Sequence, residues 1–145
     1  MEVTHLLTTT MLKHVQLTRE WSFQIEDGFK RRMEDGNLGL WKPGRTIWMA
    51  CYSPNEPAQT TLEWIKQEAP PNPSKTFEYD EGDLLRFGYL LPNADGERRA
   101  WELTAFTIAP GDYILTSFYF DEMNMLDWAL GCWKTVRYSP ETHSV

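Results

Sequence analysis

The amino-acid sequence predicts an α+β protein in which a single, mainly antiparallel sheet is flanked by two helices. Segments rich in aromatic and β-branched residues recur along the chain and indicate strands. Two other segments carry apolar residues at helical spacing. Most neighbouring strands are joined by short loops, so they should pair antiparallel. We therefore expect the order β-β-β-β-α-β-β-β-β-α, with one helix on each face of the sheet.

Four strands are predicted before the first helix. The second strand alternates between the apolar residues Trp21, Phe23 and Ile25 and polar residues, which is typical of a strand with one buried face. The third and fourth strands are joined by Lys42-Pro43-Gly44, a typical hairpin turn. The fourth strand is apolar on both faces, so we expect it at the centre of the sheet with cover on each side. These strands are predicted at residues 11–17, as an edge strand, and at 21–25, 37–41 and 45–52.

The first helix is predicted after the loop at residues 53–57. Pro57 suits the first turn of a helix, where no backbone donor is needed. The proline-rich residues 70–73 end the helix. Its apolar stripe, at intervals of three and four residues, consists of Ala58, Leu62, Ile65 and Ala69.

Four more strands and the second helix follow. Residues 80–83, 92–96 and 109–112 separate these strands and are rich in Asp, Gly and Pro, which are typical of turns. After the last strand, Asp121 offers an N-cap for the second helix. The apolar residues of this helix are Met123, Leu126, Ala129, Leu130 and Trp133. The strands are predicted at 76–79, 84–91, 99–108 and 113–120, with a short extended segment at 135–138.

The chain has 145 residues, which is enough for one domain with a substantial core. We expect a flexible N-terminal extension at residues 1–10, a single globular domain at 11–138 and a C-terminal tail at 139–145. The formal net charge of −7 repels phosphate groups and anionic lipids, so we expect no nucleic-acid and no membrane partner. The N-terminus lacks the features of a secretory signal, which favours a cytoplasmic location.

The element order resembles that of the PsbP-like and DcrB-like superfamily of small α/β/α sandwich proteins. Residues 21–29 resemble the family's opening segment, an aromatic strand followed by a turn with Gly and an aromatic residue. Family members usually carry Pro in that turn, where this chain has Glu26 or Asp27. Residues 113–137 resemble the family's ending of strand, helix and short closing segment. The resemblance implies a bacterial accessory role, mostly without catalysis, and transfers no functional residue.

We expect no catalytic residue, no metal site and no cofactor. Cys51 and Cys132 stand in apolar stretches, which predicts buried, unpaired thiols in a reducing compartment. A catalytic pair of Cys51 and His14 would need neighbouring strands and a shared face, so an inert thiol is favoured. The acidic residues at 80–83 lack the alternating ligands of a calcium loop and indicate a hairpin turn.

Aromatic residues are the most informative group, with seven Trp, seven Phe and six Tyr. Large aromatic side chains fill cores, but they also dominate binding energy at interfaces. Trp64 and Trp128 lie off the main apolar stripes of their helices, although a wide buried stripe would include them. Tyr52 and three tryptophans fall on predicted strands. The partner-binding residues predicted on this basis are Trp41, Trp48, Trp64, Trp101 and Trp128.

The predicted function is that of a non-enzymatic protein-binding module, such as an adaptor, an effector chaperone or a toxin-neutralising partner. An acidic protein favours a basic partner, because complementary charge speeds the encounter. Self-association through an exposed strand edge, giving a homodimer, is a second hypothesis. The alternative is a small-ligand-binding protein or enzyme with a pocket between sheet and helix.

Overall fold

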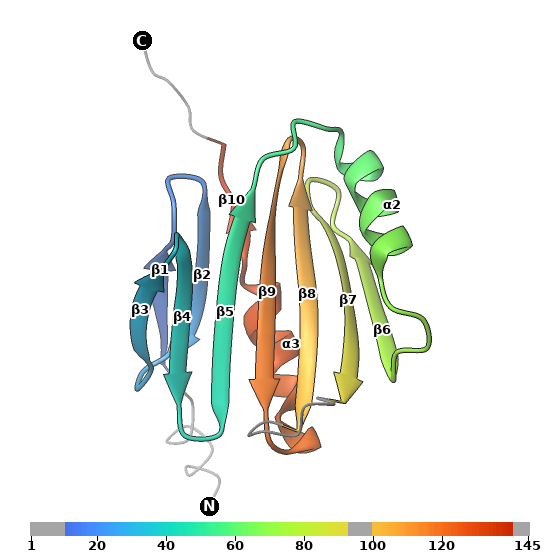
Figure 1. Ribbon diagram of the computed structural model, residues 1–145. Coiled ribbons are helices and arrows are strands. Elements are labelled where there is room, and N and C mark those ends of the chain that lie inside the picture. Colours follow the sequence, from blue (N-terminus) through green and yellow to red (C-terminus); the bar gives the residue numbers. More distant parts are fainter. Residues whose placement is uncertain (1–10, 93–99, 141–145) are drawn as a thin grey trace, which may run out of the picture.

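The computed structural model describes residues 11–92 and 100–140, which form two antiparallel sheets and two α-helices (Figure 1). The α+β class and the antiparallel pairing agree with the prediction. The larger sheet has seven strands and the smaller has three. The larger sheet consists, side by side, of β3 (Lys30–Glu34), β4 (Asn37–Lys42), β5 (Arg45–Tyr52), β9 (Asp112–Phe120), β8 (Trp101–Ala109), β7 (Leu85–Pro92) and β6 (Lys75–Asp80). The smaller consists of β1 (Leu12–Gln16), β2 (Trp21–Glu26) and β10 (Arg137–Tyr138).

The prediction of a single sheet is wrong, because the N-terminal hairpin belongs to a sheet of its own. β2 pairs with β1 on one side and with β10 on the other. Its side chains Trp21, Phe23 and Ile25 are buried in the same cluster as residues of the larger sheet. Their alternation in the sequence indicated one buried face, but alternation does not reveal which element covers that face. The hairpin covers the larger sheet instead of extending it.

The predicted element order also omits two strands. Every side chain of β3 is exposed, so this segment lacks the alternation from which a strand is recognised. Five strands therefore precede the first helix. The short segment expected to be extended at the C-terminal end pairs with β2 as β10. The expected extension at residues 1–10 lies outside the described residues, as do most of the turn at 92–96 and most of the tail at 139–145.

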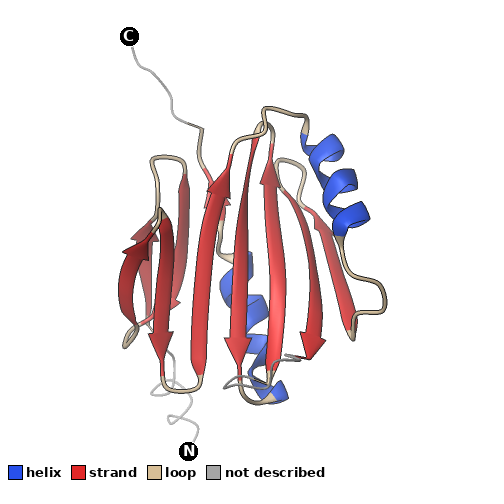
Figure 2. Cartoon of the chain, in the orientation of Figure 1, coloured by secondary structure: helices blue, strands red, loops and turns tan. Residues whose placement is uncertain are grey.

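The helices α2 (Ala58–Glu68) and α3 (Leu126–Lys134) lie on opposite faces of the larger sheet, as expected (Figure 2). Pro57 is the N-cap of α2 and precedes its first turn. The expectation that Asp121 caps the second helix is wrong, because a 3₁₀ turn, η1 (Met123–Met125), precedes α3. Neither described helix is long and apolar enough to cross a membrane.

Two apolar clusters occupy the two faces of the larger sheet and differ in size. The cluster on the α3 side combines both sheets with Leu126, Ala129 and Trp133 of α3. The cluster on the α2 side is much smaller, with Leu62 and Ile65 of α2 buried against β7, β8 and β9. This asymmetry leaves part of the α2 side without a helix, and the candidate site lies there.

Arg86 of β7 is fully buried and connects the larger sheet to the C-terminal end of α3. Its guanidinium group donates two hydrogen bonds to Glu81, at 3.1 and 3.2 Å. It also donates to the backbone carbonyl oxygens of Trp133 and Val136, both at 2.8 Å. The Trp133 carbonyl also accepts from the Val136 amide, and the Val136 carbonyl also accepts from the Arg137 side chain. Arg86 therefore adds a second, charged donor to each carbonyl and ties the end of α3 to β7.

Glu26, at the end of β2, makes a second connection between the sheets. Its carboxylate accepts a hydrogen bond from Arg45 at 2.7 Å and lies 3.1 Å from the Lys42 ammonium group. The indole of Trp128 donates to the same carboxylate at 3.1 Å. Burial by itself raises the pKa of Glu26, but the hydrogen bonds from Lys42 and Trp128 outweigh it and lower the pKa below 4.5.

We expect Arg86→Met to lower the free energy of unfolding by about 3–5 kcal/mol, because it removes the buried charged partner of Glu81 and a charged donor from two buried carbonyl groups. Arg86→Lys should recover only part of this loss, since an ammonium group cannot reproduce the forked contact with Glu81. Urea unfolding followed by circular dichroism measures both effects. The control is Arg31→Ala on the exposed strand β3, which should change stability by less than about 0.5 kcal/mol. An Arg86→Met variant as stable as the control would contradict the structural role.

The lowered pKa of Glu26 predicts how stability depends on pH. Its contribution should be complete above the ordinary pKa of 4.5 and should be lost as the pH falls through the lower pKa of the folded state. Glu26→Gln should therefore cost about 1–3 kcal/mol near neutral pH and much less at pH about 3, measured by urea unfolding. Glu34→Gln, at an exposed ion pair with Arg32, is the control and should show little of this dependence.

Candidate partner-binding face

Helix α2 covers only one side of the sheet face on which it lies. It packs on β7 and β8, and no described helix lies over β4, β5 and the far half of β9 on this face (Figure 1). The strand register shows which side chains point to this uncovered area, because directly paired residues share a face. We call this area the open face; its residues are Trp41, Trp48, Ala50, Tyr52, Leu115, Ser117 and Tyr119.

Trp48 lies flat across the middle of the open face. Gly39 is its partner on β4, and a Cβ atom built on Gly39 would lie 2.7 Å from the Trp48 ring. The indole therefore covers the glycine backbone directly, and one face of the ring is left toward solvent. The close approach requires Gly at this position, since any larger residue would displace the ring.

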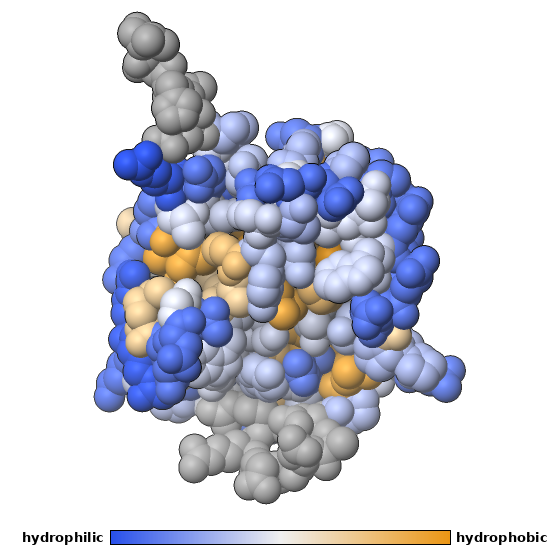
Figure 3. Space-filling view, turned by 45° about the horizontal axis from the view of Figure 1, so that its top comes forward, coloured by the Kyte–Doolittle hydropathy of each residue, from blue (hydrophilic) through white to orange (hydrophobic). Residues whose placement is uncertain are grey.

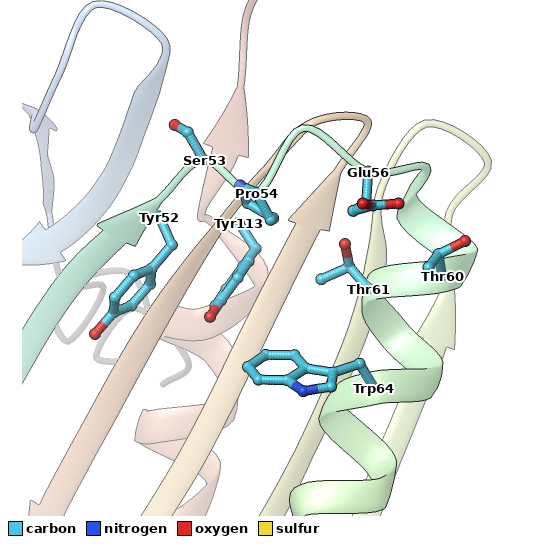
Figure 4. Close-up of a pocket in the computed structure, with 8 residues that line it drawn as sticks. All are labelled: Tyr52, Ser53, Pro54, Glu56, Thr60, Thr61, Trp64 and Tyr113. Carbon is cyan, nitrogen blue, oxygen red and sulfur yellow. The ribbon is translucent and has the colours of Figure 1, made fainter.

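A pocket of about 520 Å³ lies between α2 and the open face (Figure 4). Tyr52 and Tyr113 stand next to each other on β5 and β9, with their rings stacked at a centroid distance of 5.0 Å. Trp64 reaches from α2 toward Tyr113, at 6.4 Å between ring centroids. We call this the aromatic pocket and define it by Tyr52, Trp64 and Tyr113 together with Glu56 and Thr61.

The loop before α2 forms one end of the aromatic pocket and is attached to the sheet by two backbone hydrogen bonds. The amide of Asn55 donates to the carbonyl oxygen of Gly111 at 3.0 Å, and the amide of Gly111 donates to the carbonyl oxygen of Glu56 at 3.0 Å. Gly111 belongs to the turn between β8 and β9. The position of Glu56 is therefore fixed relative to the strand that carries Tyr113.

Thr61 is the polar group that lies deepest in the aromatic pocket. Only 3% of the residue is exposed, and its hydroxyl oxygen has no hydrogen-bond partner among the described residues. Tyr113 is also buried, which raises the pKa of its phenol, so the hydroxyl group stays protonated at neutral pH. Both hydroxyl groups are thus neutral and able to donate or accept a hydrogen bond.

A second hollow of about 200 Å³ lies next to the aromatic pocket on the open face. The two share Tyr52, and the second is lined by Trp48, Ala50, Leu115 and Ser117 among others. In the space-filling view, hydrophobic side chains gather in the middle of the molecule between bands of hydrophilic residues (Figure 3). The two hollows together offer an apolar surface that is longer than a single side chain.

The structure brings together three of the five tryptophans expected at a binding surface. Trp41 and Trp48 lie on the open face, and Trp64, half of which is exposed, stands beside it. Trp101 and Trp128 pack with the cluster on the α3 side instead. Arg32 lies over the Trp41 ring, 5.7 Å from its centroid. Their role in partner binding stays a prediction for all five.

Sequence reasoning missed Tyr113, Thr61 and Glu56 as parts of the site. Tyr113 begins a predicted strand, but its position next to Tyr52 depends on a strand register that the sequence does not contain. Thr61 lies on α2 and Glu56 in the preceding loop, where neither belongs to a motif. The one signal available in the sequence was Trp64, which lies off the apolar stripe of the helix that follows this loop.

The aromatic pocket is lined mainly by aromatic and hydroxyl-bearing side chains. The residues that line it include no Lys, Arg, His or Cys. Among the described residues, no group of three or more His, Cys, Asp or Glu side chains is arranged to hold a metal ion. His14 lies on β1 in the smaller sheet and contacts Gln16. Cys51 and Cys132 are both unpaired, but the prediction that Cys51 is buried is wrong, because the end of β5 leaves it exposed.

No protein-family model matches this chain, and no curated protein matches it. The function is therefore argued from the geometry of the open face and the aromatic pocket.

We expect Gly39→Ala to lower the free energy of unfolding by about 1–3 kcal/mol, because the new methyl group displaces the Trp48 ring from the sheet. Combining it with Trp48→Ala should make the added cost of Gly39→Ala small, and a double-mutant cycle by urea unfolding measures this coupling. Gly131→Ala is the matched control: no atom lies within 4 Å of its added Cβ, and helix propensity favours Ala by about 1 kcal/mol. Equal effects of Gly39→Ala with and without Trp48 would contradict the contact.

Proposed function

We propose that this protein is a non-enzymatic binding module that holds a basic segment of a partner protein on its open face. The observation that carries this proposal is the set of aromatic side chains on the half of the sheet that no described helix covers. Tyr52 and Trp64 are 45% and 50% exposed, although burying such side chains is strongly favourable. Exposed aromatic groups gathered on one face are typical of interaction sites.

The shape and chemistry of the open face support a protein partner. Trp and Tyr are enriched among the residues that contribute most of the binding energy at interfaces. Such residues lie near the middle of the interface and are surrounded by a polar rim. Trp48 and Tyr52 have this arrangement here, with Asn37 and Ser117 beside them. Because Trp48 is held over Gly39, its exposed ring face loses little freedom when a partner covers it.

Charge supports a basic partner. The net charge of the chain is −7. The helix beside the open face and the loop before it carry Glu56, Glu63 and Glu68. Lys66 of the same helix is 2.7 Å from Glu78 of β6, so this cation is already paired. A basic segment would meet a complementary potential at the α2 end of the open face, whereas Lys30 and Arg32 of β3 lie at the opposite end. Charge complementarity at the α2 end speeds association and disfavours acidic partners there.

The finer assignments follow from the same proposal. Helices on both faces of the sheet support the resemblance to PsbP-like and DcrB-like α/β/α sandwiches, whose members serve as accessory proteins. This argument rests on fold, and fold alone does not fix function. We also propose a cytoplasmic location, since both cysteines are free thiols, as is usual for proteins of a reducing compartment.

A selection from a random peptide library displayed on phage tests the docking proposal. We expect the wild-type protein to enrich peptides with Lys or Arg next to apolar residues, with the affinity falling as salt rises. Trp48→Ala, and Ser117→Arg in the middle of the open face, should each weaken the selected peptides about tenfold or more.

Met33→Ala is the matched control for this selection. Met33 is 58% exposed but pairs with Leu38, so it points to the opposite face of the sheet. Its removal should leave peptide affinity unchanged. The proposal fails when no peptide is enriched, when the enriched peptides are acidic, or when Met33→Ala weakens them as much as Trp48→Ala does. A homodimer that buries the open face, detected by light scattering and lost in Ser117→Arg, would also overturn it.

A further inference from the structure

The aromatic pocket combines features that fit one class of chemical group. We infer that it is a cation-binding subsite, and that its occupant is the ammonium or guanidinium end of a Lys or Arg side chain of the docked partner. This inference rests on the proposed function and specifies how the partner is recognised at one end of the open face. Three observations carry it: the ring arrangement, the charge of the lining and an unpaired buried hydroxyl group.

The rings of Tyr52, Trp64 and Tyr113 border the same cavity from two sides. The two tyrosines come from the sheet, and Trp64 comes from α2, with its ring tilted by 56° to that of Tyr113 (Figure 4). The face of an aromatic ring attracts a cation within about 6 Å of its centroid, and Trp is the strongest of the aromatic residues in this respect. A cation in this pocket would meet rings of both elements.

Elsewhere in the described chain, the protein places its own cations over aromatic rings. Five such contacts occur, among them Lys42 over Phe29 and Arg45 over Trp128, at 4.8 and 4.9 Å. None of the five involves a ring of the aromatic pocket. Among the described residues, the pocket is thus a group of three rings, two of them about half exposed, to which the chain supplies no cation of its own.

The polar groups of the pocket match a cationic donor. Glu56 is the single charged side chain among the described residues that line it. Thr61 adds a hydroxyl oxygen that is buried and has no partner in the described chain. In the close-up, Thr61 stands on the pocket side of α2 between Glu56 and Trp64 (Figure 4). Ammonium and guanidinium groups carry donors and no acceptor, so both oxygens would serve them directly.

The position of the two hollows points to a partner's side chain as the source of the cation. Tyr52 lines both the aromatic pocket and the hollow lined by Trp48 and Ser117, so the two are neighbours on the open face. A partner segment lying on the open face can therefore place one side chain into the aromatic pocket while its neighbours cover Trp48. A free amine would use the pocket alone and would gain nothing from Trp48, which gives a means of telling the two sources apart.

The first experiment is an NMR titration of the full-length protein, which follows the indole N–H signals of its tryptophans. The probes are N-acetyl-arginine amide and N-acetyl-citrulline amide, which have nearly the same shape but differ in charge. We expect the arginine probe to shift the Trp64 signal and the citrulline probe to bind about tenfold more weakly. The indole signal of Trp101, on the opposite side of the sheet, is the internal control and should not move.

Two variants test whether the arginine probe binds in the aromatic pocket. Trp64→Ala should weaken the arginine probe about tenfold, monitored through the Tyr52 and Tyr113 ring signals. Glu56→Gln keeps the size of the side chain and should weaken binding of the arginine probe about threefold. The effect should be small because the pocket is open to solvent, which weakens the attraction between charges. Both changed residues are exposed, so both variants should fold. Equal binding of the charged and neutral probes, or no loss in either variant, would overturn the inference.

The second experiment uses a peptide selected on the open face and the same peptide with each Arg replaced by citrulline and each Lys by acetyl-lysine. At one position of the peptide, we expect removal of the charge to lower the affinity about tenfold. The same removal should no longer lower the affinity for the Trp64→Ala variant. When peptides depend on Trp48 but no basic position depends on Trp64, the docking proposal stands and the subsite is wrong. When the arginine probe binds but no peptide depends on Trp48, the partner's side chain is the wrong source and the proposed function fails.

Discussion

The buried guanidinium group of Arg86 is the interaction on which the α3 side of the fold depends. It binds Glu81 before β7 and the last carbonyl groups of α3, so one side chain joins the sheet, the helix end and the chain that continues into β10. β10 in turn completes the smaller sheet by pairing with β2. Desolvation lowers the pKa of Arg86, yet its contacts with Glu81 oppose this effect and keep it charged. A charged group this deeply buried is tolerated only when its donors are satisfied.

The smaller sheet and α3 cover one face of the larger sheet, and the other face is covered only in part by described elements. The smaller sheet and α3 together close the α3 side. On the opposite side the described residues supply α2 alone, whose 11 residues cover β7 and β8. The buried cluster under α2 covers only part of this face, and the proposed binding surface is the remainder. On that face, the contact with Gly39 restricts the Trp48 side chain.

The sequence predicted the elements well and their mutual arrangement less well. The apolar run at residues 45–52 correctly predicted β5 as an interior strand of the larger sheet, because apolar character on both sides is a local property. The cover expected on both of its sides is wrong, since no described helix lies over β5 on the open face. The exposed edge strand β3 has no such pattern and was missed. Alternation in β2 could not show that its partner layer is a second sheet. The same limit applies to the site: the place of Trp64 on its helix left both exposure and burial open, and the pairing of Tyr52 with Tyr113 requires the register.

The paired hydrogen bonds between Asn55, Gly111 and Glu56 have a thermodynamic consequence for recognition. They tie the loop to the β8–β9 turn, so the loop is already rigid before a ligand arrives. A loop that must be ordered during association subtracts that lost entropy from the affinity. Here that entropy is already lost during folding. We therefore expect association to be that of a pre-organised site, with little rearrangement of the backbone around Glu56 when the partner binds.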